Sequence, residues 1–197
     1  LTVHEHKSGL SVKTLNKSLE LLIPEKQAKT LAKLEVDGAS ARVYLENLTV
    51  QELEIDTASG NVELQGCETQ KLDIDSASGD CKTTDCVLGE FSMDSASGSA
   101  KLHGSVRELN MDTASGNLTV ETDKTPEKVE VDAVSGDTLL TLPADASFTL
   151  KQSGVSGDVK IEGFAATVSG KSYVCGDGSA EFKFESVSGD VTVRAAQ

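Results

Sequence analysis

The chain has 197 residues, of which 32 are Asp or Glu and 18 are Lys or Arg, so its formal net charge is −14. This balance disfavours nucleic-acid binding, because a protein that neutralises phosphates needs a basic stripe, and the arginines here stand only at positions 42, 107 and 194. No apolar run approaches the roughly 20 residues that cross a bilayer. The composition therefore predicts neither a nucleic-acid partner nor a membrane span within this sequence.

The first 33 residues lack the spacing that organises the rest of the chain. Residues 1–6 read as a strand from the very first position, so we expect the chain to be part of a longer protein, and a missing leader peptide is then uninformative. We interpret residues 1–33 as an irregular first coil or N-terminal cap. Residues 34–197 follow as repeats within the same single domain.

A five-residue phrase, Asp-(Thr or Ser)-Ala-Ser-Gly, recurs at residues 56–60, 75–79, 94–98 and 112–116. Weaker copies stand at 37–41, where Ala41 takes the glycine position, and at 132–136, 154–157 and 186–189. The spacing of 18–21 residues between most copies is typical of a stack of similar coils.

Apolar residues flank each copy at fixed offsets. Leu53 and Ile55 precede Gly60, for example, and Val62 and Leu64 follow it. A period of two predicts a strand with one buried face. The prolines lie between copies or ahead of the first one, where they interrupt no strand. Each copy is therefore predicted to be a strand, a tight Ser-Gly corner, a second strand and a loop.

An antiparallel meander is the rival topology, but it would not require the same residue at the same place in every repeat. Parallel stacking does, because equivalent positions then lie on top of one another about 4.8 Å apart. We predict an all-β fold, a right-handed parallel β-solenoid of about eight coils, with the hand taken from the general crossover rule. Stacking between neighbouring coils must supply most of its stability.

The gap between the last two copies is longer than the others, and we interpret residues 163–178 as an insertion. The last repeat strand, residues 191–193, ends close to the end of the sequence, and an open final edge would invite pairing with another molecule. We expect the insertion to cover that final coil. Because a net charge of −14 also opposes self-association, we expect a monomer.

Cys67 and Cys86 stand at equivalent loop positions of adjacent copies. The stacking distance lies within the Cα separation that a disulfide tolerates, so the two residues are candidates for a disulfide, with a pair of reduced thiols as the alternative. A bond would indicate an oxidising compartment. Cys81 falls in an apolar position and is interpreted as a small core residue, and Cys175 has no evident partner.

An aspartate occupies the same position in successive copies, as Asp37, Asp56, Asp75, Asp94, Asp112 and Asp132. These carboxylates either cap the N–H groups of the Ser-Gly corner or form a row of like charges that attracts cations. The cation column would consist of Asp56, Asp75, Asp94 and Asp112. The sequence carries no recognisable catalytic or cofactor motif, and we expect no catalytic residue, no cofactor and no resident metal.

The corner is followed by Asp or Asn and an alternating apolar pair at residues 59–64, 156–161 and 188–193. This pattern resembles the bacterial adhesin family of β-strand-repeat (β-solenoid) surface proteins over roughly residues 34–193. The resemblance implies a surface-exposed or envelope-associated β-solenoid linked with envelope stress, and it brings no catalytic residues.

Two functional hypotheses follow. The first is a non-enzymatic, adhesin-like binding module at the cell surface or envelope, whose surface ligand or protein partner the sequence does not identify. The second is a carbohydrate-active β-helix enzyme that uses paired aspartates on an outer face. The absence of tryptophan and the scarcity of long loops favour the first hypothesis.

Overall fold

The computed structural model describes residues 2–6, 9–14 and 31–197, and its side chains are described from residue 31 onward. Every helix or strand in these residues is a β-strand. They are β1 (Thr2–His6), β2 (Gly9–Thr14), β3 (Leu31–Gly38), β4 (Val43–Glu46), β5 (Thr49–Thr57), β6 (Val62–Gln65), β7 (Glu68–Ser76), β8 (Cys81–Thr84), β9 (Cys86–Ser95), β10 (Ala100–Ser115), β11 (Leu118–Thr122), β12 (Lys128–Ser135), β13 (Thr138–Leu142), β14 (Phe148–Gly154), β15 (Val159–Glu162), β16 (Ala166–Ser169), β17 (Ser172–Cys175), β18 (Ala180–Ser188) and β19 (Val191–Ala195).

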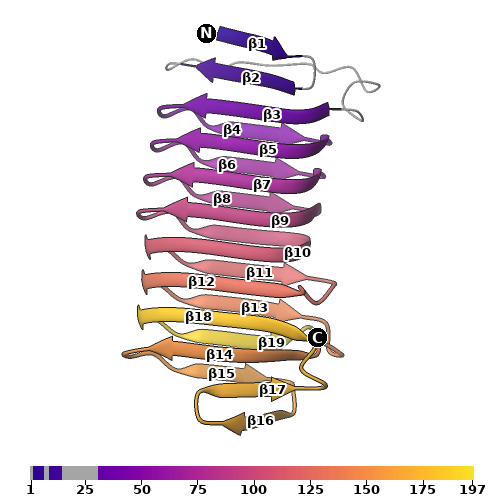
Figure 1. Ribbon diagram of the computed structural model, residues 1–197, viewed down its shortest axis with the longest axis vertical. Coiled ribbons are helices and arrows are strands. Elements are labelled where there is room, and N and C mark those ends of the chain that lie inside the picture. Colours follow the sequence, from indigo (N-terminus) through magenta and orange to yellow (C-terminus); the bar gives the residue numbers. More distant parts are fainter. Residues whose placement is uncertain (1, 7–8, 15–30) are drawn as a thin grey trace.

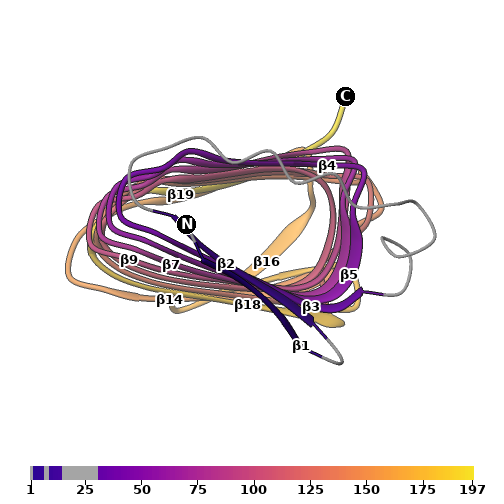
Figure 2. The ribbon, with the colours of Figure 1, turned by 90° about the horizontal axis from the view of Figure 1, so that it is seen from above.

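Each coil consists of a long strand, a corner and a second strand, and each strand pairs in parallel with its counterparts in the neighbouring coils. β5 lies between β3 and β7, and β6 lies between β4 and β8. Equivalent residues are in register, so that Asp56 pairs with both Asp37 and Asp75. Seen along the rod, the coils superpose (Figure 2). The predicted parallel β-solenoid is confirmed.

β10 passes through a loop position without interruption. Its first part, from Ala100, pairs with β8 and β11, and its second part pairs with β9 and β12. The chain turns at Gly104, whose φ of 129° lies outside the region that side chains favour. A Cβ at Gly104 would lie 2.1 Å from the carbonyl oxygen of Cys86. This glycine explains why the repeat shortens there without loss of strand pairing.

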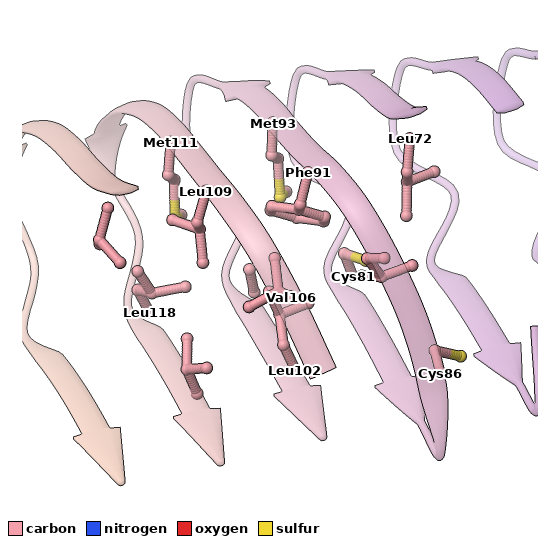
Figure 3. Packing of buried hydrophobic residues seen from close by; sticks show 14 of the residues in the cluster. Leu72, Cys81, Cys86, Phe91, Met93, Leu102, Val106, Leu109, Met111 and Leu118 are labelled. Carbon is pink, nitrogen blue, oxygen red and sulfur yellow. The ribbon is translucent and has the colours of Figure 1, made fainter. Parts of the chain in front are cut away.

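Apolar columns fill the interior, as the two-residue period predicted. One column follows the long strands, and the other follows the second strands opposite. Figure 3 shows part of this packing around Phe91, Leu109 and Leu118. The first column includes Leu34, Leu53, Leu72, Phe91, Leu109 and Val129, and the second includes Val43, Val62, Cys81, Ala100 and Leu118, all of them buried. In the coil with bulky Phe91 and Met93, the second strand contributes the smaller Ala100 together with Leu102.

The corner glycines allow the coils to stack closely. A Cβ at Gly79 would lie 2.1 Å from the carbonyl oxygen of Gly60 in the preceding coil. No side-chain atom fits at that distance, so glycine is required by the neighbouring backbone. In Gly38, by contrast, a Cβ would meet nothing closer than 3.6 Å.

The order of the coils departs from the order of the chain near the C-terminus. Six coils follow one another from β3 to β13 in the described residues. β14 then pairs with β18 and not with β12, and β18 in turn pairs with β12. Likewise β19 lies between β13 and β15. The chain therefore skips one layer after β13 and returns to fill it with β18 and β19, as the yellow strands of Figure 1 show.

This arrangement corrects the expected position of the insertion. The C-terminal coil is not the end of the rod, because both of its strands have partners on each side. The insertion contains the hairpin β16–β17, and β17 pairs antiparallel with β14. The hairpin thus covers the coil made of β14 and β15, which precedes it in the chain. At the other end of the rod, β1 pairs antiparallel with β2, and β2 pairs in parallel with β3.

Candidate functional site

The six aspartates that the sequence singled out form one continuous row on the outside of the rod. Register pairs join Asp37, Asp56, Asp75, Asp94, Asp112 and Asp132 in that order. Glu185 of β18 is paired with Asp132 and extends the row by one layer. We call these seven residues the acidic row. Adjacent carboxylates stand on strands about 4.8 Å apart, so the row concentrates negative charge along the rod axis.

Like charges and partial burial raise the pKa values of several members of the row. Desolvation is the larger cause for Asp56 and Asp75, and the neighbouring aspartates add to it. Desolvation also raises the pKa of Asp94, and the neighbouring Asp112 adds to the increase. The pKa of Asp132 is raised by desolvation and by Glu185, although Lys183 acts in the opposite direction. Within residues 31–197, no ion pair joins the row to a lysine or arginine.

At the corners of Gly60, Gly79 and Gly98 the glycine N–H is not capped by an aspartate of the row, contrary to the first interpretation. The hydroxyl group of the following residue caps it instead: the N–H of Gly60 donates to Thr57 Oγ1 at 2.9 Å. The N–H groups of Gly79 and Gly98 donate in the same way to Ser76 and Ser95, both at 2.7 Å. The aspartate carboxylates are left on the surface because a shorter side chain already satisfies the turn.

The residue after each corner glycine has a structural role of its own. Its side-chain oxygen accepts a hydrogen bond from the backbone N–H of the equivalent residue in the next coil. Asn61 accepts from Asp80, and Asp80 accepts from Ser99. The same ladder continues through Ser99, Asn117, Asp137, Asp190 and Asp158. The ladder even crosses the layer where chain order is broken, which explains the repeated Ser-Gly-Asp and Ser-Gly-Asn phrases.

Two hollows follow the acidic row. The first, of about 930 Å³, is lined by Asp37, Asp56, Asp75 and Asp94 and by the small residues of the corners, such as Ala58. The second, of about 610 Å³, lies beside Asp112, Asp132 and Glu185. Its other lining residues include three valines, one from each of the last three layers: Val134, Val187 and Val155.

The three valines are exposed, with 56% of Val134, 51% of Val187 and 86% of Val155 accessible to solvent. We call them the valine ridge. The same corner position holds Ala58, Ala77, Ala96 and Ala114 in the earlier coils. The acidic row and the corners therefore make one long face, which is small and polar toward the N-terminus and apolar toward the C-terminus.

Family comparison now identifies the type of repeat. The model of the Toastrack DUF4097 family matches residues 1–194. The chain belongs to the Toastrack family. No curated protein and no solved structure matches it. The match supports the expected β-repeat family, whereas an adhesin role stays a prediction.

A further hollow of this Toastrack member, of about 630 Å³, follows a bend in the long strands. Its lining includes Gln51, Gln70, Gly89 and Arg107, one from each of four coils. Gln51, Gln70 and Gly89 have no register partner in the neighbouring strands, although the residues on either side of each of them are paired. Sequence reasoning missed this hollow. Its signal was the break in alternation at Gln51 and Glu52, where two consecutive side chains point outward.

The structure brings Cys67 and Cys86 together, as the equivalent positions predicted, and both are buried free thiols. The neighbouring Cys67 thiol lowers the pKa of Cys86 to about 6, and the neighbouring Cys86 and burial raise the pKa of Cys67. Cys81 is in the core, where burial raises its pKa. Burial also raises the pKa of Cys175. Whether Cys67 and Cys86 form a disulfide stays a prediction.

Neither a metal site nor a membrane span is found in the part of the Toastrack chain that the structure describes. No group of three or more His, Cys, Asp or Glu side chains there could hold a metal ion, and this includes the cation column Asp56, Asp75, Asp94 and Asp112. No helix in the same residues is long and apolar enough to cross a bilayer. The carboxylates of the row lie side by side on one open face. This arrangement presents negative charge to the solvent and does not enclose a substrate.

Proposed function

We propose that this Toastrack chain is a non-catalytic binding module of the cell surface or envelope, and that its binding face is the acidic row with the adjoining corners. The observation that carries the proposal is the row of seven acidic residues beside two hollows on one side of the rod, which no ion pair joins to a lysine or arginine within residues 31–197. Such a face attracts positively charged partners and speeds their association.

The stacked fold supports this role because it holds charges at a fixed spacing. Each carboxylate is placed by a strand that hydrogen-bonds to both neighbours, so little conformational freedom is lost when a partner binds. The ion pairs of the same strands lie one residue or more away from the row. Lys33 pairs with Glu52 and Glu54, and Lys71 pairs with Asp73. Among the side chains that the structure describes, these lysines pair with glutamate or aspartate outside the acidic row.

The proposal is tested with a lysine homopolymer of about 15 residues as the probe and with the row neutralised by Asp56→Asn, Asp75→Asn, Asp94→Asn and Asp112→Asn. The control variant makes the same change in net charge elsewhere: Glu68→Gln, Glu121→Gln, Asp123→Asn and Asp145→Asn, all of which are exposed. We expect the row variant to weaken binding about tenfold or more at low salt, and the control to weaken it about twofold. Equal losses in the two variants would show that only net charge matters and would contradict a binding face.

The proposed location is tested separately in cells that make the full-length protein. A reagent that labels amines but does not cross membranes should label this domain in intact cells. Labelling that appears only after lysis would contradict a surface location while leaving the binding face untouched.

A glycan-cleaving enzyme is the second candidate, favoured by one observation. Asp94 and Asp112 are register neighbours, and desolvation and the charge of Asp112 raise the pKa of Asp94; glycoside hydrolysis uses two carboxyl groups, one of which must stay protonated. The test is a screen of oligosaccharides for cleavage by the unaltered chain. Turnover that is abolished by Asp94→Asn and by Asp112→Asn would place this candidate first.

A further inference from the structure

The C-terminal end of the binding face combines two features that the rest of the face lacks together. Val134, Val187 and Val155 expose apolar surface on three consecutive layers, and Asp112, Asp132 and Glu185 lie in the same hollow. Exposed apolar side chains that gather beside a hollow mark an interaction site more often than scattered ones do. The acidic neighbours add a charge requirement to that site.

The two features run in parallel along the rod axis. Val187 is stacked between Val134 and Val155, because its neighbours Ser186 and Ser188 pair with β12 and Ser186 also pairs with Gly154 of β14. Glu185 is stacked between Asp132 and Ser153 in the same way. A partner that contacts both features must therefore lie along the rod and carry apolar groups on one side and positive groups on the other.

The spacing of the layers selects the conformation of that partner. Equivalent residues of the rod repeat about every 4.8 Å. An α-helix brings a side chain back to the same face about every 5.4 Å, whereas an extended strand does so only every second residue, at about 6.6 Å. Over three layers a helix drifts from the valine ridge by only about 1 Å, but a strand drifts by nearly 4 Å. A helix of a few turns therefore matches this end of the face.

We propose that the valine ridge and the adjoining part of the acidic row bind a basic amphipathic helix of a partner protein, laid along the rod axis. This proposal rests on the proposed function, because it names the partner of the same face. Apolar side chains of the helix pack on Val134, Val187 and Val155, and lysine or arginine on its flank faces Asp112, Asp132 and Glu185. Two lysines lie at the border of this site. Lys183 lies near Asp132, and Lys171 donates a hydrogen bond to the carbonyl oxygen of Gly154 at 2.9 Å.

The experiment uses two labelled peptides of about 15 residues and the same composition. One has leucine at helical spacing and lysine on the flank, and the other has the same residues in scrambled order. Fluorescence anisotropy measures binding, and circular dichroism measures the helix gained on binding. The test variant is Val187→Ala/Val155→Ala, which restores the alanine of the earlier coils. The matched control is Val87→Ala/Val168→Ala, two exposed valines outside the ridge.

We expect the amphipathic peptide to bind at least tenfold more tightly than the scrambled one and to gain helix on binding. The ridge variant should weaken this binding about tenfold or more, and the control variant less than about twofold. Equal binding of the two peptides, or equal effects of the two valine variants, would overturn the proposal. If neutralising Asp56, Asp75, Asp94 and Asp112 still weakens binding of the lysine homopolymer in that case, the proposed acidic binding face is retained. Only the proposal that a helix binds the valine ridge is then wrong.

Discussion

The corners of the earlier coils and those of the last layers solve the same turn in two different ways. In the earlier coils a buried hydroxyl group accepts the glycine N–H, as Thr57 does for Gly60 at 2.9 Å. At Gly116 the N–H donates instead to the carbonyl oxygen of Ser135 in the next layer, and Thr113 Oγ1 is left buried without a hydrogen-bond partner. The corner glycines that follow Gly116 have positive φ angles, for example 146° at Gly136 and 152° at Gly189.

The difference separates what the turn needs from what the surface does. Where the hydroxyl caps the turn, the exposed corner residue is alanine. Where the glycine conformation makes the turn, the corner residue is the exposed valine of the ridge. The two corner types therefore divide the rod into a part with local hydroxyl caps and a part, from Gly136 onward, with corner glycines of positive φ, and the Gly116 corner lies between them. The predictions below test that division, beginning with the largest effect.

Removal of the C-terminal coil should have the largest effect, because β18 and β19 each pair on both edges. A chain that ends at residue 179 would lose four strand pairings together with buried Phe182 and Phe184. We expect this chain to lose its cooperative thermal transition in circular dichroism, while a control chain that ends at residue 195 keeps it. A truncated chain that melts within a few degrees of the intact one would show that β14 can pair directly with β12.

The corner glycine is common to both parts of the rod, and Gly79→Ala tests how closely the layers approach. The added Cβ would lie 2.1 Å from the carbonyl oxygen of Gly60, so the backbones must separate. We expect a loss of about 3 kcal/mol or more in the free energy of unfolding, measured with urea. Gly38→Ala is the control, since its Cβ would have ordinary contacts, and it should change stability by less than about 1 kcal/mol. Similar losses in both variants would contradict close approach as the cause.

Cross-linking two of the earlier coils should stabilise that part of the rod. Oxidation with a mild thiol oxidant should join Cys67 and Cys86, which are buried neighbours. A closed loop of this length contributes on the order of 3 kcal/mol by the chain-entropy account, which would raise the melting temperature by about 6–12 °C. Cys67→Ser should abolish the increase and Cys175→Ser should not. An unchanged melting temperature, with both thiols still free after oxidation, would remove the disulfide.

The two corner types can be compared directly with one pair of substitutions, Thr57→Val and Thr113→Val. Both threonines are 7% exposed, but only Thr57 accepts a hydrogen bond from a corner glycine. Thr57→Val should cost about 1–2 kcal/mol, because the N–H of Gly60 loses its acceptor. Thr113→Val should be neutral or slightly stabilising, because it removes an unpaired buried hydroxyl. Equal costs, measured by urea unfolding, would mean that the hydroxyls do not distinguish the two corner types.

The sequence was sufficient for the repeat but not for the order of its layers. Copies of one phrase predict stacking because each position requires the same neighbour, and the strands lie where alternation placed them. The order of the layers could not be predicted, because the sequence pattern of residues 180–193 is compatible with a position on either side of the coil that begins with β14. One signal was present: Gln152 is paired with Phe184 in an interior column, and a polar residue there is tolerated best in an end layer.

The candidate site was predicted in the same uneven way. The aspartate row was evident from the repeat, but its role as a turn cap was wrong, because the adjacent Thr or Ser reaches the glycine N–H over a shorter path. Val134, Val155 and Val187 were not predicted, because their grouping depends on three layers that are not consecutive in the chain. Glu185 joins the row only because β18 pairs with β12.

The smallest effect concerns pH and the acidic row. Raised pKa values at Asp56, Asp75, Asp94 and Asp132 mean that the folded chain takes up protons at a higher pH than the unfolded chain does. Folding should therefore become more favourable as the pH falls from 7 through these raised values toward the ordinary aspartate value of about 3.9. Glu130 acts in the opposite sense, because its pKa is lowered by Lys128 and its contribution is lost at low pH.

Since the row is largely exposed, solvent screening should limit the increase in melting temperature to about 1–2 °C. Asp75→Asn should raise the melting temperature at pH 7 and reduce its pH dependence, whereas Asp123→Asn, outside the row, should leave that dependence unchanged. A melting temperature that falls steadily from pH 7 downward in both variants and in the unaltered chain would show that repulsion within the row does not control stability.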